Sequence, residues 1–201
     1  MKVNYQLVCD KQIDEISRAG KTPSLLLQSC CGPCSSYVLE YLSEYFNVTI
    51  LFYNPNIFPA EEYEKRLEAQ KKIISQMPFK NTVTLLDSSY NHSEFLDSVG
   101  GFENEREGGA RCEKCFWLRM RKTAEIAKEN GFDYFTTTLS VSPHKNSAML
   151  NEIGEKLEEE IGVKFLYSDF KKREGYKRSI ELSKQFELYR QEYCGCEFSI
   201  W

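Results

Sequence analysis

The chain has 201 residues, 41% of them hydrophobic and 28% charged, and its 26 basic and 30 acidic residues give a net charge of −4. A chain of this length buries roughly 70% of its unfolded surface, so folding requires neither a metal nor disulfides. The charge excludes a uniformly basic nucleic-acid-binding protein, and no run of about 20 apolar residues predicts a membrane span. The first twenty residues mix both charges without an apolar core, unlike a signal peptide, and we expect a cytoplasmic protein.

The hydrophobic pattern predicts strands that alternate with helices. The expected strands are Ser24–Gln28, Val48–Tyr53, Thr82–Leu86, Tyr134–Leu139 and Val163–Tyr167. The expected helices are Cys34–Phe46, Ala60–Met77, Ser93–Val99, Cys112–Asn130, Asn146–Ile161 and Ser179–Arg190. Residues 1–23 are expected to form a helical extension, and residues 191–201 a tail that folds back to the site. Strands joined by such helices favour one α/β domain over residues 1–201, with a parallel five-stranded sheet covered on both faces.

Seven of the eight cysteines fall in three tight groups, which is the unusual feature of this composition. The groups are Cys30, Cys31 and Cys34, then Cys112 and Cys115, then Cys194 and Cys196, while Cys9 stands alone. In a reducing compartment such clustering indicates metal or redox chemistry rather than a disulfide framework. The first group follows an expected strand, and ligands of such sheets bind at the carboxyl ends of the strands. Gly32 and Pro33 break the strand, so that adjacent thiols can face one site.

The spacing of the other two groups also has chemical meaning. The two-residue gap between Cys112 and Cys115 occurs in zinc sites, iron–sulfur sites and dithiol redox pairs. A disulfide across the single residue between Cys194 and Cys196 would be strained, as in labile redox pairs, and metal binding is the alternative. Thiolate-only ligation suits an iron–sulfur cluster, and seven thiolates exceed the four that one cluster uses. The residues alone leave the metal open.

Five segments resemble, in order and spacing, the QueH family of epoxyqueuosine reductases, from about Leu25 to Ser199. They are SLLLQSCCGPCSSYVLEYL, FYNPNIFPAEEYEKR, RCEKCFWLRMRKTAEIA, TTTLSVSPHKN and YRQEYCGCEFS. The resemblance implies a Rossmann-like fold of the PP-loop (HUP-like) type, with cysteines in place of the ATP-binding loop, so ATP use is not expected. It also implies the last step of queuosine biosynthesis, the two-electron reduction of the epoxide of epoxyqueuosine at the wobble position of a tRNA anticodon.

The same resemblance implies the roles of the cysteines. The [4Fe–4S] ligands would be Cys30, Cys31, Cys112 and Cys115, and the redox-active pair would be Cys194 and Cys196. A second iron or zinc ion on Cys34, Cys194 and Cys196 stays an alternative. His144 follows the fourth expected strand and is a candidate proton donor, since imidazole titrates near neutrality. A separate electron donor, which the sequence does not identify, would supply the electrons.

Two basic runs, residues 111–122 and 171–178, each contain five basic residues and one acidic residue. They and the polar residues after the second expected strand are candidates for contact with the tRNA or its modified base. The candidates are Tyr53, Asn54, Asn56, Arg66, Arg111, Arg119, Lys171, Lys172 and Arg173. Charge runs are more often solvated helix faces, and Asn-Pro-Asn is a good turn by itself. His92 is expected to be an exposed residue at a helix start.

Two other functions use the same residues. A sulfurtransferase that thiolates tRNA could hold sulfide on a cluster, but it would need an ATP-binding loop, and the cysteines occupy that position. A zinc-containing RNA-binding module would use the cysteines without catalysis. Metal content distinguishes them, because an iron-rich brown protein favours the reductase and a colourless zinc protein favours the module.

Overall fold

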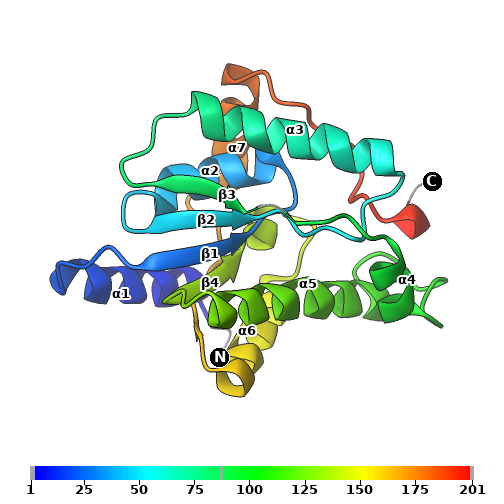
Figure 1. Cartoon of the computed structure of the whole chain (residues 1–201), viewed down its shortest axis with the longest axis horizontal. Helices are drawn as coiled ribbons and strands as arrows, with labels where there is room; N and C mark the ends of the chain where they lie inside the picture. Colours follow the sequence, from blue (N-terminus) through cyan, green and yellow to red (C-terminus); the bar gives the residue numbers. More distant parts are fainter. Residues whose placement is uncertain (1–2, 87, 200–201) are drawn as a thin grey trace.

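The computed structural model describes residues 3–86 and 88–199, which surround one sheet of parallel strands (Figure 1). The strands are β1 (Ser24–Gln28), β2 (Asn47–Leu51), β3 (Val83–Leu86), β4 (Tyr134–Thr137) and β5 (Lys164–Phe165). They lie in the order β3-β2-β1-β4-β5, and every neighbouring pair is parallel. This is the strand order of Rossmann-like sheets. The predicted α/β fold with a five-stranded parallel sheet is therefore confirmed.

Helices cover both faces of this sheet (Figure 1). On one face α2 (Gly32–Leu42) lies between α3 (Ala60–Gln76) and α7 (Gly175–Gln185) and packs against both. On the other face α5 (Ala110–Glu129) packs against α6 (Ser147–Ile161) and against the short α4 (Ser93–Val99). The remaining elements are α1 (Tyr5–Arg18), the 3-10 helix η1 (Thr138–Val141) after β4, and η2 (Glu197–Ser199).

The central strand β1 supplies side chains to two cores, one on each face. Leu25 and Leu27 pack in the core that includes α2, while Leu26 packs in the core that includes α5 and α6. All three leucines are fully buried. A strand that is covered on both faces carries a continuous apolar run rather than an alternating one, which is why the segment SLLLQ lacks polar residues at its centre.

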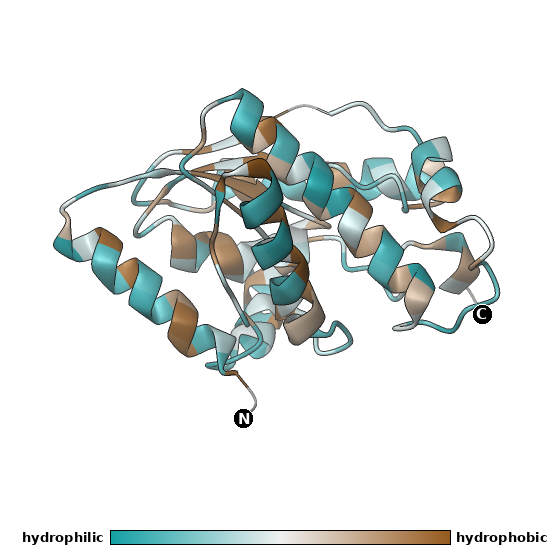
Figure 2. Cartoon of the chain, turned by 90° about the horizontal axis from the view of Figure 1, so that it is seen from below, coloured by the Kyte–Doolittle hydropathy of each residue, from teal (hydrophilic) through white to brown (hydrophobic). Residues whose placement is uncertain are grey.

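Helix α1 protects the sheet edge at β5. The side-chain amide of Gln12 donates to the carbonyl of Phe165 and accepts from the amide of Tyr167, each over 3.0 Å. These bonds occupy backbone groups that a further strand would otherwise pair with. In Figure 2 each helix combines hydrophobic and hydrophilic residues along its length, as expected for helices with one face on a core. In the described chain, no helix combines the length and the apolar character needed to cross a bilayer.

Most elements lie close to their predicted positions. β1 and α4 have the predicted bounds, whereas α2 and α5 each begin two residues early. The early start of α2 follows from its N-cap, because the Cys31 sulfur accepts a hydrogen bond from the amide of Cys34. Cys34 therefore lies inside the first turn of α2. The strand predicted to reach Leu139 ends at Thr137 and continues as η1, and β5 is only two residues long.

The prediction for the last helix is wrong in its bounds. Helix α7 ends at Gln185, whereas the sequence pattern extended the helix to Arg190. Glu187 has a φ of 48°, outside the helical region, and this turn sends Leu188 into the core next to α2. The last cysteines therefore lie on an irregular segment, not at the end of a helix.

Candidate metal centre

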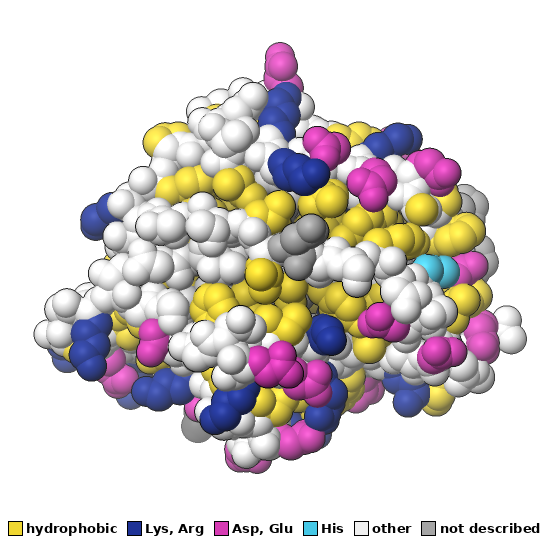
Figure 3. All heavy atoms as spheres, in the orientation of Figure 1, with side chains coloured by type: hydrophobic (Ala, Val, Ile, Leu, Met, Phe, Trp, Pro, Cys, Tyr) yellow, Lys and Arg dark blue, Asp and Glu magenta, His cyan; other side chains and the backbone are white. Residues whose placement is uncertain are grey.

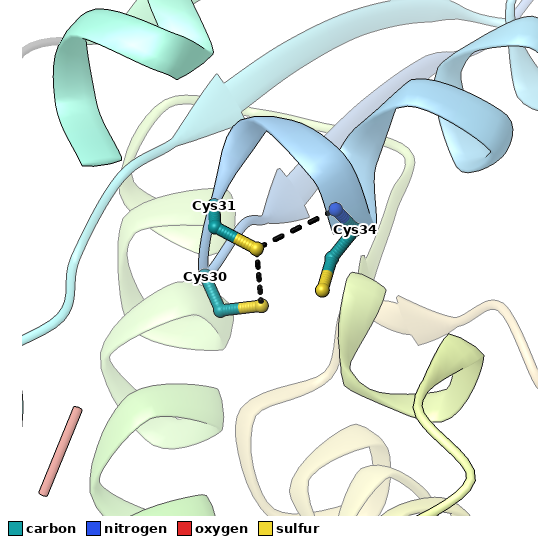
Figure 4. A group of neighbouring side chains, drawn as sticks. All are labelled: Cys30, Cys31 and Cys34. Carbon is teal, nitrogen blue, oxygen red and sulfur yellow. Dashed lines mark hydrogen bonds between the residues drawn. The ribbon is translucent and has the colours of Figure 1, made fainter. Parts of the chain in front are cut away.

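The first cysteine group lies just after the carboxyl end of β1. This strand has β2 on one side and β4 on the other, so the strand order reverses here. Sheets of this type bind ligands at such a point. The sulfurs of Cys30, Cys31 and Cys34 all lie within 4.8 Å of one another, and Figure 4 shows them gathered at the start of α2. The Cys30 and Cys31 sulfurs are 3.7 Å apart. A Cβ on Gly32 would lie 2.5 Å from the Ala69 carbonyl oxygen, so glycine allows α2 to begin this close to α3.

The second and third cysteine groups meet each other beside α5. Cys112 and Cys115 lie in the first turns of this helix, and Cys196 packs with Cys115 and Phe95 in a small apolar cluster. The residues of these groups line one small cavity, whose lining includes Cys112, Cys115, Cys194, Cys196, Arg119 and Lys145. The fold therefore brings together thiols that are about eighty residues apart in the sequence.

Arg66 of α3 holds the segment that carries the last two cysteines. Its guanidinium is 1% exposed, donates to the carbonyls of Cys194 at 2.9 Å and Tyr193 at 3.2 Å, and pairs with Glu62 at 2.7 Å. Gly195 has a φ of +105°, and a Cβ there would lie 2.8 Å from an Arg66 nitrogen. Glycine between the two cysteines is therefore required both by the backbone and by the guanidinium that anchors it.

A second contact holds the chain after Cys196. The Nδ1 atom of His92 lies 2.7 Å from the Pro55 carbonyl oxygen, and its Nε2 atom lies 2.7 Å from the Glu197 carboxylate. Its side chain is only 17% exposed, so the expectation of an exposed His92 is wrong. The residue joins the start of α4 to η2 and fixes the end of the described chain against the site.

A larger cavity of about 360 Å³ lies next to the first cysteine group. Cys30 and Cys34 line it, as does Cys194 from the third group. Cys194, Arg119 and Lys145 line this cavity and the smaller one as well, so all three cysteine groups border one region at the carboxyl edge of the sheet. The volume lies within the range of small-molecule pockets, about 300–1,000 Å³.

The thiols of this region differ in acidity. Hydrogen bonds with Cys31 and Cys34 hold the pKa of Cys30 well below its ordinary value, whereas burial raises the pKa of Cys31 to about 12. Burial also raises the pKa of Cys115, which the charge of Arg119 opposes. Burial disfavours the charge of Lys145, but the Cys194 thiolate and Glu107 outweigh it and raise the pKa of this ammonium. The surroundings therefore favour the thiolate at Cys30, whereas burial favours the neutral thiol at Cys31 and Cys115.

The structure places the predicted substrate residues in two different environments. Six of them are buried, namely Tyr53, Asn54, Asn56, Arg66, Arg111 and Arg119. The hydroxyl of Tyr53 donates to the Glu94 carboxylate, and Asn54 accepts from Arg119 at 2.8 Å. His144, in contrast, is exposed at the rim of the larger cavity.

The second basic run lies at the surface near the N-terminal end of α6. Lys171 pairs with Asp169 at 2.8 Å and Arg173 pairs with Asp10 at 2.6 Å, while Lys172 is exposed. On the face shown in Figure 3, basic and acidic side chains are interspersed. Two of the three predicted cations are thus partly neutralised by carboxylates.

Sequence reasoning missed three residues of the site. Lys145 lines both cavities and pairs with Glu107 at 3.6 Å, and the Gln191 amide donates to the Cys31 sulfur at 3.0 Å. Lys145 directly follows His144 in the loop after β4. Its position after the fourth strand, which made His144 a candidate, would have made Lys145 a candidate too. Glu107 lies in a glycine-rich loop whose position no sequence pattern predicts.

The donor set fits a metal ion. A tetrahedral ion with metal–sulfur bonds of about 2.3 Å places its ligands about 3.8 Å apart, which matches the separation between the Cys30 and Cys31 sulfurs. Cys31 is fully buried, so its thiolate would be costly without a partner, and a bound metal would remove that cost. The fold and the site together define a Rossmann-like α/β protein with a cysteine triad that could hold a metal at the carboxyl edge of its sheet.

Comparison with known proteins agrees with this class. The family model described as epoxyqueuosine reductase QueH matches residues 25–201. A protein of that name from Streptococcus pyogenes is 42% identical over 200 residues, covering 98% of this chain and 78% of the relative. Namesakes from Staphylococcus epidermidis (41% identical, 98% and 85% covered) and Thermotoga maritima (37% identical, 88% and 90% covered) are similar too. The chain belongs to the epoxyqueuosine reductase QueH family.

Proposed function

We propose that this protein reduces the epoxide of epoxyqueuosine at the wobble position of tRNA and thereby completes queuosine. Two electrons and two protons convert the epoxide into an alkene and release its oxygen as water. The observation that supports the proposal is the gathering of three cysteine groups around two adjoining cavities, the larger of about 360 Å³, in a chain of this family. The electrons come from a separate donor.

We propose further that the thiolates hold a [4Fe–4S] cluster. Its ligands would be Cys30, Cys31, Cys112 and Cys115, which leaves Cys34, Cys194 and Cys196 for a second iron or zinc ion. When bound, such a group supplies single electrons and a Lewis acid for the departing oxygen. The tight Cys30–Cys31–Cys34 triad supports the alternative in which these three thiols share one ion and the four thiols beside α5 hold the cluster.

The chain's own residues would bind the nucleoside and deliver protons. The larger cavity would admit the modified base, and Leu139 and Val141 from η1 form an apolar part of its wall. His144 at the rim is exposed to solvent and lines the cavity, so it can carry protons inward to the oxygen that leaves. Lys145 places a positive charge next to Cys194, where the oxygen would gain negative charge.

The decisive experiment is anaerobic purification with iron and sulfide analysis, followed by a mass-spectrometric assay on tRNA that contains epoxyqueuosine. We expect a brown protein with about four irons or more per chain, and conversion of the epoxide to the alkene. A colourless zinc protein without turnover would instead favour an RNA-binding module, and transfer of sulfur to the tRNA would favour a sulfurtransferase.

Single substitutions test the ligands. Cys112→Ala should remove both the brown colour and turnover, because a cluster ligand is lost, whereas Cys9→Ala serves as a matched control in the core that keeps both. Cys34→Ala should keep the visible spectrum of the cluster if Cys34 binds a second ion. A colourless but active Cys112→Ala protein would contradict the assignment.

A further inference from the structure

Two arginines of α5 are buried and have no acidic partner in the part of the chain that the structure describes. Arg111 is 2% exposed and Arg119 is 3% exposed, and neither forms an ion pair with a carboxylate among the described residues. Arg111 donates to backbone carbonyls, including that of Glu103 at 2.6 Å, and Arg119 donates to the Asn54 side chain. Within residues 3–86 and 88–199, the Nε of each guanidinium has no hydrogen-bond partner. A buried cation is costly unless an anion accompanies it.

The side chains next to Arg119 that could supply such an anion are the cysteine thiols. Arg119 lines the larger cavity with Cys30 and Cys34, and it lines the smaller cavity with Cys112 and Cys115. Arg119 thus lies between the first and second cysteine groups, as does Lys145, but Lys145 pairs with Glu107.

A buried relay of hydrogen bonds fixes this guanidinium. The Asn54 oxygen accepts from Arg119 at 2.8 Å and from the Gln28 amide at 3.1 Å. Gln28 in turn accepts from the Thr137 hydroxyl at 2.9 Å, and the Asn54 amide donates to the Ser29 carbonyl at 2.8 Å. The relay joins the carboxyl ends of β1, β2 and β4 to α5, so the charge is held in place before any ligand arrives.

We propose that Arg119 is the shared counter-ion of the cysteine groups, a positioning residue that sets the charge and hence the reduction potential of the group they hold, and not an RNA contact. The reduction-potential part rests on the proposed function, whereas the counter-ion part does not. Three or more thiolates around a divalent ion carry a net negative charge, and so does a thiolate-bound iron–sulfur cluster. A fixed cation between the groups stabilises both.

The first test measures Co²⁺ binding to the metal-free full-length protein by its thiolate-to-metal absorption. Arg119→Gln should weaken Co²⁺ binding about tenfold, which is about 1.4 kcal/mol, whereas Arg119→Lys, which keeps the charge, should weaken it less. Arg121→Gln is the matched control, because Arg121 lies on the same helix, 40% exposed and paired with Glu160 at 2.7 Å. Circular dichroism monitors folding, and Arg119→Lys keeps the test decisive if Arg119→Gln does not fold.

The second test measures the midpoint potential of the anaerobically loaded protein and its affinity for tRNA. We expect Arg119→Gln to lower the potential by about 59 mV, a tenfold change in a one-electron equilibrium, with tRNA affinity unchanged. Unchanged Co²⁺ binding and potential together with weaker tRNA binding would overturn the proposal and make Arg119 an RNA contact. If Co²⁺ binding depends on Arg119 but no iron is found, the counter-ion inference stands and the proposed reductase function fails.

Discussion

Cysteine chemistry in this chain depends on the surroundings of each thiol. Cys9 is fully buried in the core beneath α2, and burial, with the nearby charge of Asp10, raises its pKa to about 12. Cys30 lies at the start of α2 among other thiols, whose hydrogen bonds lower its pKa. The first behaves as a small apolar side chain, and the second is prepared for metal binding.

This contrast predicts the order of chemical modification. In the folded, metal-free protein, iodoacetamide should alkylate the partly exposed Cys30 and Cys194 and leave Cys9 unmodified, as peptide mass spectrometry would detect. An unfolded cysteine ionises at about pH 8.5, so the stability that a neutral Cys9 provides is complete below that pH and is lost as the pH rises toward 12. Cys9 reacting as fast as Cys194 would contradict this assignment.

At the scale of elements, the site depends on an irregular segment fixed by a regular one. Helix α3 contributes Arg66, whose hydrogen bonds hold the backbone around Cys194. The hydroxyl of Tyr189 also donates to Glu62 on the same helix at 2.8 Å. Buried backbone carbonyls need hydrogen-bond donors, and an irregular segment has no neighbouring strand to provide them. Here the Arg66 guanidinium provides them instead.

Arg66→Met should therefore loosen the segment from residue 186 to residue 199. We expect faster hydrogen exchange in that segment and a loss of about 3 kcal/mol in the free energy of unfolding, since a buried Glu62 loses its cation. Lys65→Met, one residue away and exposed, is the matched control and should change neither. Exchange confined to α3, with the segment unchanged, would show that Arg66 does not anchor it.

At the scale of the whole molecule, the net charge of −4 conceals an uneven distribution. Buried cations gather around the cysteines, and exposed ones such as Lys172 lie near the N-terminal end of α6. The buried cations offset thiolate charge, so that only the exposed ones are free to meet phosphates. If the surface near α6 that carries Lys172 binds tRNA, each phosphate contact would contribute little to the affinity, and the affinity would fall as the salt concentration rises.

Replacing Lys171, Lys172 and Arg173 with glutamine should lower the slope of log affinity against log salt by about 1–2, because each phosphate contact contributes about 0.7–0.9. The matched control replaces Lys21, Lys80 and Lys128, exposed residues near the amino edge of the sheet, and makes the same change in net charge. Filter binding of tRNA at several salt concentrations gives both slopes. Equal slopes for the two triple variants would remove this surface from the RNA-binding site.

The sequence by itself determined the fold class and the location of the chemistry. The apolar run of β1 requires cover on both faces, and the strand break at Gly32 places thiols at the carboxyl end of that strand, so both follow from local pattern. The tight grouping of cysteines also indicated a metal or redox site without any knowledge of the fold.

Only the tertiary structure decided which charges serve the site. Arg111 and Arg119 are buried, yet the sequence does not distinguish them from exposed basic residues. A run of basic residues looks the same in the sequence whether the helix face that carries it is solvated or buried. Their burial depends on α5 packing over the sheet edge and on Asn54 meeting the guanidinium from the end of another strand. Likewise, the packing of Cys196 against Cys115 is a long-range contact that local periodicity does not contain.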